Sequence, residues 1–177
     1  MAAELRGAGD GSAADTTRRC FEYVRDRVRH SWDHRADAHN PLTCAAPQVL
    51  AEGTGYCYAK SHLLAALLRA NDLPAALCYQ RLVLEPGSGR YCLHGLNAVH
   101  LPGHGWYRLD PRGNKPGVAA AFAPPREQLA FALDDPGERD FPGLYPEPLA
   151  AIRAAAMPAC RKPWKKFPTP RPCPPPP

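Results

Sequence analysis

The chain has 177 residues, a formal net charge of +5 and a mean hydropathy of −0.41. A chain of this length can bury one substantial core, so a single domain is expected. No run approaches the roughly 20 apolar residues that span a bilayer, and the first residues carry Glu4, Arg6 and Asp10 where a signal peptide needs an apolar stretch. We therefore expect a cytoplasmic protein that does not enter a membrane.

The excess positive charge lies in the last 20 residues. Residues 158 to 177 contain five basic and no acidic residues, which leaves 17 basic and 17 acidic residues in positions 1 to 157. A neutral body lacks the basic surface of a nucleic-acid-binding domain, so that class of partner is excluded. The same 20 residues include nine prolines, which predicts a disordered, proline-rich basic tail at 158 to 177.

The seven cysteines form neither a disulfide framework nor a zinc motif, because their number is odd and no C-x-x-C pair occurs. No metal ion and no other cofactor is expected. An alternative interpretation takes six cysteine and histidine residues as metal ligands, but they lack the short sequence spacing that metal sites normally use. These residues are Cys44, Cys57, His62, Cys78, Cys92 and His94.

Residues 1 to 14 are rich in glycine, alanine and polar residues and predict a disordered lead-in to a domain at 15 to 157. Asp15 can cap a helix that runs to about His30, and a short helix is expected between Thr43 and Gly53. The strongest helical pattern covers residues 56 to 70, with good helix formers between the apolar positions of one stripe. This stripe consists of Leu63, Leu64, Leu67 and Leu68.

The second half of the domain predicts an antiparallel sheet. Residues 76 to 84 form a buried strand, and residues 91 to 101 and 105 to 109 form a hairpin with a three-residue loop. Residues 124 to 149 contain six prolines and predict irregular chain with one short helix near 127 to 132. The fold class is therefore α+β.

Cys57 follows a Gly-Thr-Gly turn and falls in the first turn of the predicted helix at 56 to 70. Unpaired backbone N–H groups and the positive end of the helix dipole stabilise a thiolate at such a position. The same N–H groups can stabilise the negative charge that develops on a carbonyl oxygen during acyl transfer. Cys57 is therefore the candidate nucleophile.

The hairpin supplies a base and an acid for this thiol. With a three-residue loop and Leu101 opposite Gly105, Asp110 falls opposite Leu96 and diagonal to His94 on the same face. The carboxylate can then fix the orientation of the imidazole and stabilise its protonated form. The spacing predicts a Cys57, His94 and Asp110 triad.

Three segments together resemble the transglutaminase-like superfamily of papain-related cysteine enzymes, most of all its small bacterial stand-alone members. The resemblance covers roughly residues 18 to 149 and implies a papain-like α+β fold, in which the cysteine helix packs against an antiparallel sheet. By this resemblance Cys57 is the nucleophile, His94 the base and Asp110 the orienting acid, and His100 and His104 are surface or turn residues. The segments are Gly55-Tyr56-Cys57-Tyr58-Ala59-Lys60, His94-Gly95-Leu96-Asn97-Ala98-Val99 and Gly105-Trp106-Tyr107-Arg108-Leu109-Asp110.

The resemblance implies a cysteine-dependent enzyme that forms a thioester from an amide or peptide acyl group. Hydrolysis is favoured over cross-linking, because no second-substrate module is evident, and the substrate would be a protein, a peptide or a small amide. Trp32 and Gln48 are the two candidates for a second hydrogen-bond donor to the oxyanion, and the sequence does not decide between them. Three arginines near the predicted sheet would suit an acidic substrate, although solvated arginines are common; they are Arg81, Arg108 and Arg112.

A different class of function stays open at this point. In that interpretation the triad is vestigial and the domain is a scaffold whose proline-rich tail recruits a protein partner. Deletion of residues 158 to 177 would then abolish an interaction that Cys57→Ala leaves untouched. The sequence assigns no oligomeric state.

Overall fold

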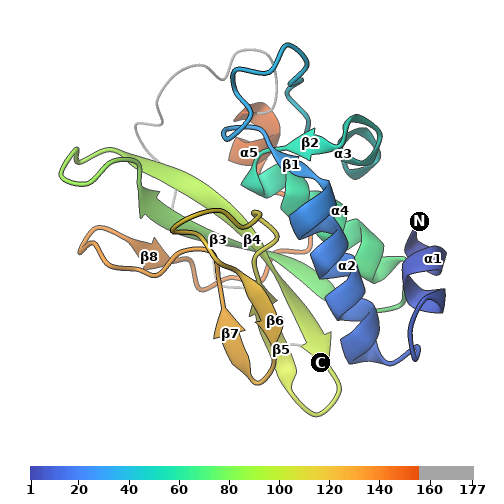
Figure 1. Cartoon of the computed structure of the whole chain (residues 1–177). Coiled ribbons are helices and arrows are strands. Elements are labelled where there is room, and N and C mark those ends of the chain that lie inside the picture. The colour runs from blue at the N-terminus through green and yellow to red at the C-terminus, as the bar shows by residue number, and fades with distance from the viewer. Residues whose placement is uncertain (156–177) are drawn as a thin grey trace.

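A four-stranded antiparallel sheet lies at the centre of the computed structural model, which describes residues 1–155 (Figure 1). The strand order is β5-β4-β3-β8. The tail that we expected at 158 to 177 lies outside the described residues. The strands are β3 (Ala75–Val83), β4 (Tyr91–Leu101), β5 (Gly105–Leu109) and β8 (Arg139–Asp140).

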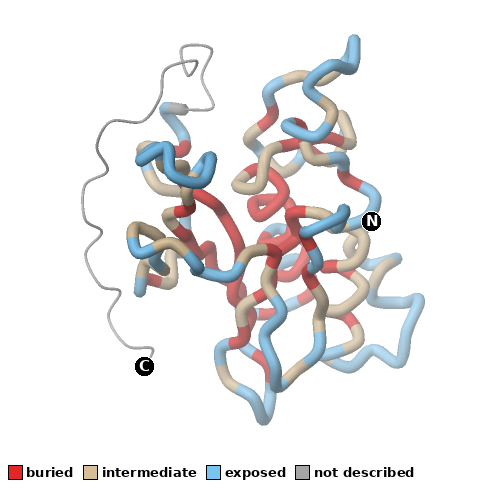
Figure 2. The backbone as a smooth tube through the Cα atoms, turned by 60° about the vertical axis from the view of Figure 1, so that its left-hand side comes forward, coloured by how far each residue is buried: buried red, intermediate tan, exposed pale blue. Residues whose placement is uncertain are grey.

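Helices cover one side of this sheet. Helix α4 packs against β4 and β3, and α2 packs on α4 (Figure 1). Buried residues concentrate in the interior, where these layers meet (Figure 2). The core includes Phe21 and Leu64. The expected α+β architecture is confirmed. The helices are α1 (Ala2–Gly7), α2 (Ala13–Arg27), α3 (Ala46–Glu52), α4 (Cys57–Arg69) and α5 (Ala150–Ala155).

Two short strand pairs complete the structure. Strand β1 (Arg29–His30) pairs in parallel with β2 (Thr54–Gly55), and His30 lies opposite Gly55. Strands β6 (Ala121–Ala123) and β7 (Arg126–Gln128) form a small antiparallel hairpin. The first of these pairs brings His30 next to the start of α4.

Three local predictions differ from the structure. The expected disordered lead-in contains helix α1, because Ala2 and Leu5 pack against the core. Helix α2 begins earlier than expected, since the side chain of Ser12 accepts a hydrogen bond from the Asp15 amide at 3.1 Å and takes the capping role. The prediction of a short helix near residues 127 to 132 is wrong, because part of this segment forms strand β7 and pairs with β6.

Gly95 lets α4 approach the sheet closely. A Cβ atom at this position would lie 2.8 Å from the Cα atom of Tyr58, which is closer than such atoms approach. The absence of a side chain therefore brings the first turn of α4 onto β4. None of the helices within residues 1–155 has both the length and the apolar character to cross a bilayer.

Candidate active site

Cys57 is the first residue of α4. The chain reaches it through the left-handed Gly53, which ends α3 at φ 62°, and then through β2. No side chain caps the helix at Tyr56, so the first-turn N–H groups remain available to a bound acyl group. The backbone N–H of Gly95 points to Sγ of Cys57 at 3.5 Å, which gives a thiolate a further donor.

His94 and Asp110 meet as their spacing predicted. Leu101 pairs with Gly105 and Asn97 with Leu109, which confirms the register of the hairpin. Nε2 of His94 donates a hydrogen bond to Oδ2 of Asp110 at 2.7 Å, and both side chains are buried. His94 also hydrogen-bonds with Cys57. The structure thus brings Cys57, His94 and Asp110 together.

Backbone groups fix the carboxylate of Asp110. Oδ1 accepts a hydrogen bond from the N–H of Arg112 at 3.1 Å, and Oδ2 accepts one from the N–H of Ala130 at 3.1 Å. The ring of Phe131 meets the His94 ring edge-on, with the two centroids 5.1 Å apart. The segment that the sequence predicted as wrapping coil therefore covers the histidine and orders its acid.

The electrostatics favour an ion pair between sulfur and imidazole. Burial alone would raise the pKa of Cys57, but the positive charge of His94 and hydrogen bonds from His30 and His94 lower it to about 5. Burial likewise opposes protonation of His94, yet the carboxylate of Asp110 and the sulfur of Cys57 raise the pKa of His94 to about 10. At neutral pH the pair is thiolate and imidazolium.

Cys57 differs in this respect from the other cysteines of residues 1–155, all of which are also free thiols. Burial raises the pKa of Cys20 to about 11, of Cys78 to about 12 and of Cys92 to about 11. Burial also raises the pKa of Cys44. Only Cys57, among the described cysteines, has the low pKa of a nucleophilic thiol.

His30 is a site residue that the sequence did not identify. It hydrogen-bonds with Cys57, and its ring meets that of Tyr56 edge-on at 5.9 Å between centroids. The two residues that the sequence offered as a second oxyanion donor, Trp32 and Gln48, are both exposed. Trp32 is 54% exposed with the Arg35 guanidinium over its ring, and Gln48 is an exposed residue that accepts a hydrogen bond from the Cys44 amide.

His100, His104 and Arg108 do not join the site. His100 and His104 are exposed, the latter in the hairpin turn, as predicted. Arg108 forms ion pairs with Glu127 and Asp140. Within residues 1–155 no group of three or more histidine, cysteine, aspartate or glutamate side chains is arranged to hold a metal ion.

The family model of the transglutaminase-like superfamily matches residues 1–111. The match covers more than half of the chain, and the chain belongs to this superfamily. A search of curated proteins finds no match.

Solved structures with a similar fold give TM-scores just below 0.5. A proposed cysteine protease from Cytophaga hutchinsonii is 19% identical with a TM-score of 0.47, over 63% of this chain and 35% of that one. A TGase is 16% identical with a TM-score of 0.49, over 70% and 32%. The periplasmic domain of TgpA from Pseudomonas aeruginosa, bound to ethylmercury, is 21% identical with a TM-score of 0.46, over 62% and 41%. The matched region thus spans less than half of each of these solved chains.

Proposed function

We propose that the protein is a thiol enzyme that takes an acyl group from an amide or peptide onto Cys57 and passes it to water. The observation that carries this proposal is the geometry of three side chains at the start of α4. Cys57 hydrogen-bonds with a buried histidine, His94, whose other ring nitrogen is held by the buried carboxylate of Asp110 at 2.7 Å. Superfamily membership supports the same reaction class.

The residues of the site suit each step of acyl transfer to Cys57 and of hydrolysis of the resulting thioester. The thiolate of Cys57 attacks the carbonyl carbon, and the oxygen becomes an oxyanion. The first-turn N–H groups of α4 and the side chain of His30 are the candidate donors to that oxyanion. His94 gives its proton to the leaving amine, which leaves a thioester on Cys57. His94 then takes a proton from water, which attacks the thioester and releases the acid.

Two acceptors for the acyl group must be separated by experiment. We prefer water, because the described residues form one domain around a central four-stranded sheet and offer no second module for an amine substrate. Incubation with a peptide mixture containing glutamine, with and without a primary amine, followed by mass spectrometry, distinguishes the two. Hydrolysed products in both samples support a hydrolase; amine adducts that outnumber hydrolysed products would instead identify an acyltransferase.

We also propose that the enzyme works in the cytoplasm. All five cysteines within residues 1–155 are free thiols, and free thiols persist in reducing compartments. Fractionation of cells that express the natural protein checks the compartment. Recovery in an extracytoplasmic fraction would contradict this proposal.

A further inference from the structure

His30 has a carboxylate neighbour three residues along its own loop. Oδ2 of Asp33 lies 3.9 Å from Nδ1 of His30, and this Nδ1 is buried and has no hydrogen-bond partner. Because Nδ1 bonds to nothing, Nε2 is left for the hydrogen bond with Cys57. His30 therefore has the same type of neighbours as His94: the sulfur on one side and a carboxylate on the other.

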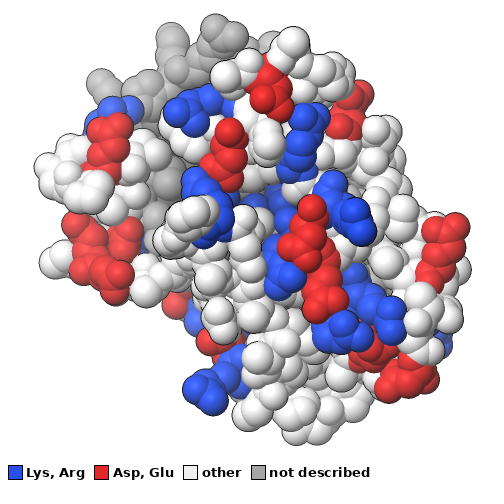
Figure 3. Space-filling model, viewed as in Figure 1, with Lys and Arg blue, Asp and Glu red and all other residues white. Residues whose placement is uncertain are grey.

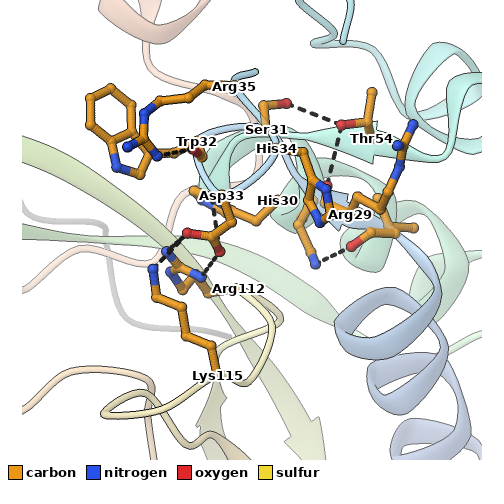
Figure 4. A network of polar contacts seen from close by, with 12 residues as sticks. Arg29, His30, Ser31, Trp32, Asp33, His34, Arg35, Thr54, Arg112 and Lys115 are labelled. Carbon is orange, nitrogen blue, oxygen red and sulfur yellow. Dashed lines mark hydrogen bonds and ion pairs between the residues drawn. The ribbon is translucent and has the colours of Figure 1, made fainter. Parts of the chain in front are cut away.

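Asp33 is held in place by two cations (Figure 4). The guanidinium of Arg112 donates to both carboxylate oxygens, at 2.5 and 3.0 Å, and Nζ of Lys115 donates at 2.6 Å. A bidentate pair of this kind fixes the plane of the carboxylate as well as its position. Burial opposes ionisation of Asp33, but Arg112 and Lys115 hold its pKa well below the usual range, so it stays negative.

Arg112 connects the two histidine and carboxylate pairs. Its backbone N–H donates to Asp110, the partner of His94, while its guanidinium binds Asp33, the neighbour of His30. Arg112 is 5% exposed and its guanidinium lies 5.8 Å from the centroid of Phe131. One buried residue thus sets the positions of both carboxylates.

We propose that Asp33 is a positioning residue that orients His30 and stabilises its protonated form, and that Arg112 holds Asp33 and Asp110 in one rigid frame. The proposal rests on the proposed function, because His30 acts on the same thiol. It adds a second histidine and carboxylate pair to a site in which the sequence indicates only one.

The surroundings of His30 suit a group that gains and loses a proton. A polar cavity of about 240 Å³ lies on one side, lined by His30, Asp33, Lys60 and Arg112 among others, and it is large enough to hold water. Figure 3 shows basic and acidic side chains intermixed on one face of the molecule. Burial lowers the pKa of His30, and the positive charge of Arg112 lowers it further. Cys57 and Asp33 act in the opposite direction and raise the pKa of His30. Asp33 therefore favours the charged form that the other surroundings oppose.

The same loop contains a matched control. His34 and Asp37 have the same three-residue spacing, and their side chains meet at 3.1 Å between Nδ1 and Oδ2. Their side chains are 42% and 40% exposed, and Asp37 also binds Arg29. Asp37→Asn therefore removes an acid beside a histidine in this loop without touching the thiol site.

The first test is an NMR titration of His30 in the Cys57→Ser protein, which needs no catalysis. Asp33→Asn is expected to weaken proton binding by His30 about tenfold, equivalent to one pKa unit. Asp33→Glu is expected to retain most of the wild-type proton affinity, and Asp37→Asn all of it. An unchanged His30 titration in Asp33→Asn would overturn the proposal.

The second test asks whether the effect passes through His30 to the sulfur. We would measure the rate at which Cys57 reacts with 4,4′-dithiodipyridine at pH 6 in a double-mutant cycle. Asp33→Asn is expected to slow the reaction in the wild-type background and to have no effect in His30→Gln. An equal effect in both backgrounds would reduce Asp33 to a structural role. If Cys57 of the wild type is unreactive at pH 6, the proposed function fails, and the His30 titration still decides the link to Asp33.

Discussion

Removal of His94 tests the ion pair at the thiol, and the size of the effect follows from the protonation of Cys57. The pKa of Cys57 is lowered to about 5, so its thiolate is present above that pH and is lost as the pH falls through it. In His94→Ala the charge and hydrogen bond of His94 are gone, and the remaining effects oppose each other, because burial raises the pKa of Cys57 while His30 lowers it. We therefore use the ordinary pKa of 9.0 for the thiol of the variant. At pH 6 the thiolate fraction then falls from about 0.9 to about 0.001.

The rate falls less than the thiolate fraction, because a more basic thiolate is a better nucleophile. With a Brønsted coefficient of about 0.4 to 0.5, the gain over four pKa units is about 40- to 100-fold. We therefore expect Cys57 to react with 4,4′-dithiodipyridine about 10- to 20-fold more slowly in His94→Ala at pH 6, with little difference at pH 7. Stopped-flow absorbance with peptide mapping measures the rate at Cys57, and circular dichroism controls for folding. Equal rates at pH 6 would refute the ion pair.

Three further predictions concern the acid and the packing behind the site. Asp110→Asn should slow acylation of Cys57 by p-nitrophenyl acetate by about a hundredfold or more, because the histidine loses its orientation and charge partner; a wild-type rate would contradict this. Gly95→Ala should lower the free energy of unfolding by about 1–3 kcal/mol, since its Cβ would meet the backbone of Tyr58 at 2.8 Å; an unchanged urea midpoint would show that α4 shifts freely. Leu64 is fully buried, and Leu64→Ala should lower the free energy of unfolding by about 2–5 kcal/mol; a loss below about 1 kcal/mol would contradict its place in the core.

The sequence predicted the elements whose patterns are local. The apolar stripe of α4 and the three-residue loop between β4 and β5 are each contained in a short run, so the position of Cys57 and the register of His94 against Asp110 could be worked out. The resemblance to the superfamily strengthened both, and the family match agrees with it.

The parts that the sequence missed depend on contacts between distant segments. His30 reaches Cys57 because β1 pairs with β2, which begins 25 residues further along, and a two-residue strand leaves no periodic signal. Ala130 binds Asp110 from a proline-rich segment that has no repeating pattern. Helix α1 is short and polar, and its two apolar contacts, Ala2 and Leu5, were too few to predict a packed helix.

Peptide-mapped mass spectrometry of the acyl-enzyme shows directly whether Cys57 is the nucleophile. The wild-type protein would be quenched in acid within seconds of mixing with p-nitrophenyl acetate, at pH 6, and compared with His94→Ala. We expect an acetyl group on Cys57 in the wild type, its decay in water, and little acetylation of Cys57 in the variant. Acetyl groups spread evenly over the cysteines, or equal acetylation of Cys57 in both proteins, would contradict the claim that Cys57 and His94 form a nucleophilic pair.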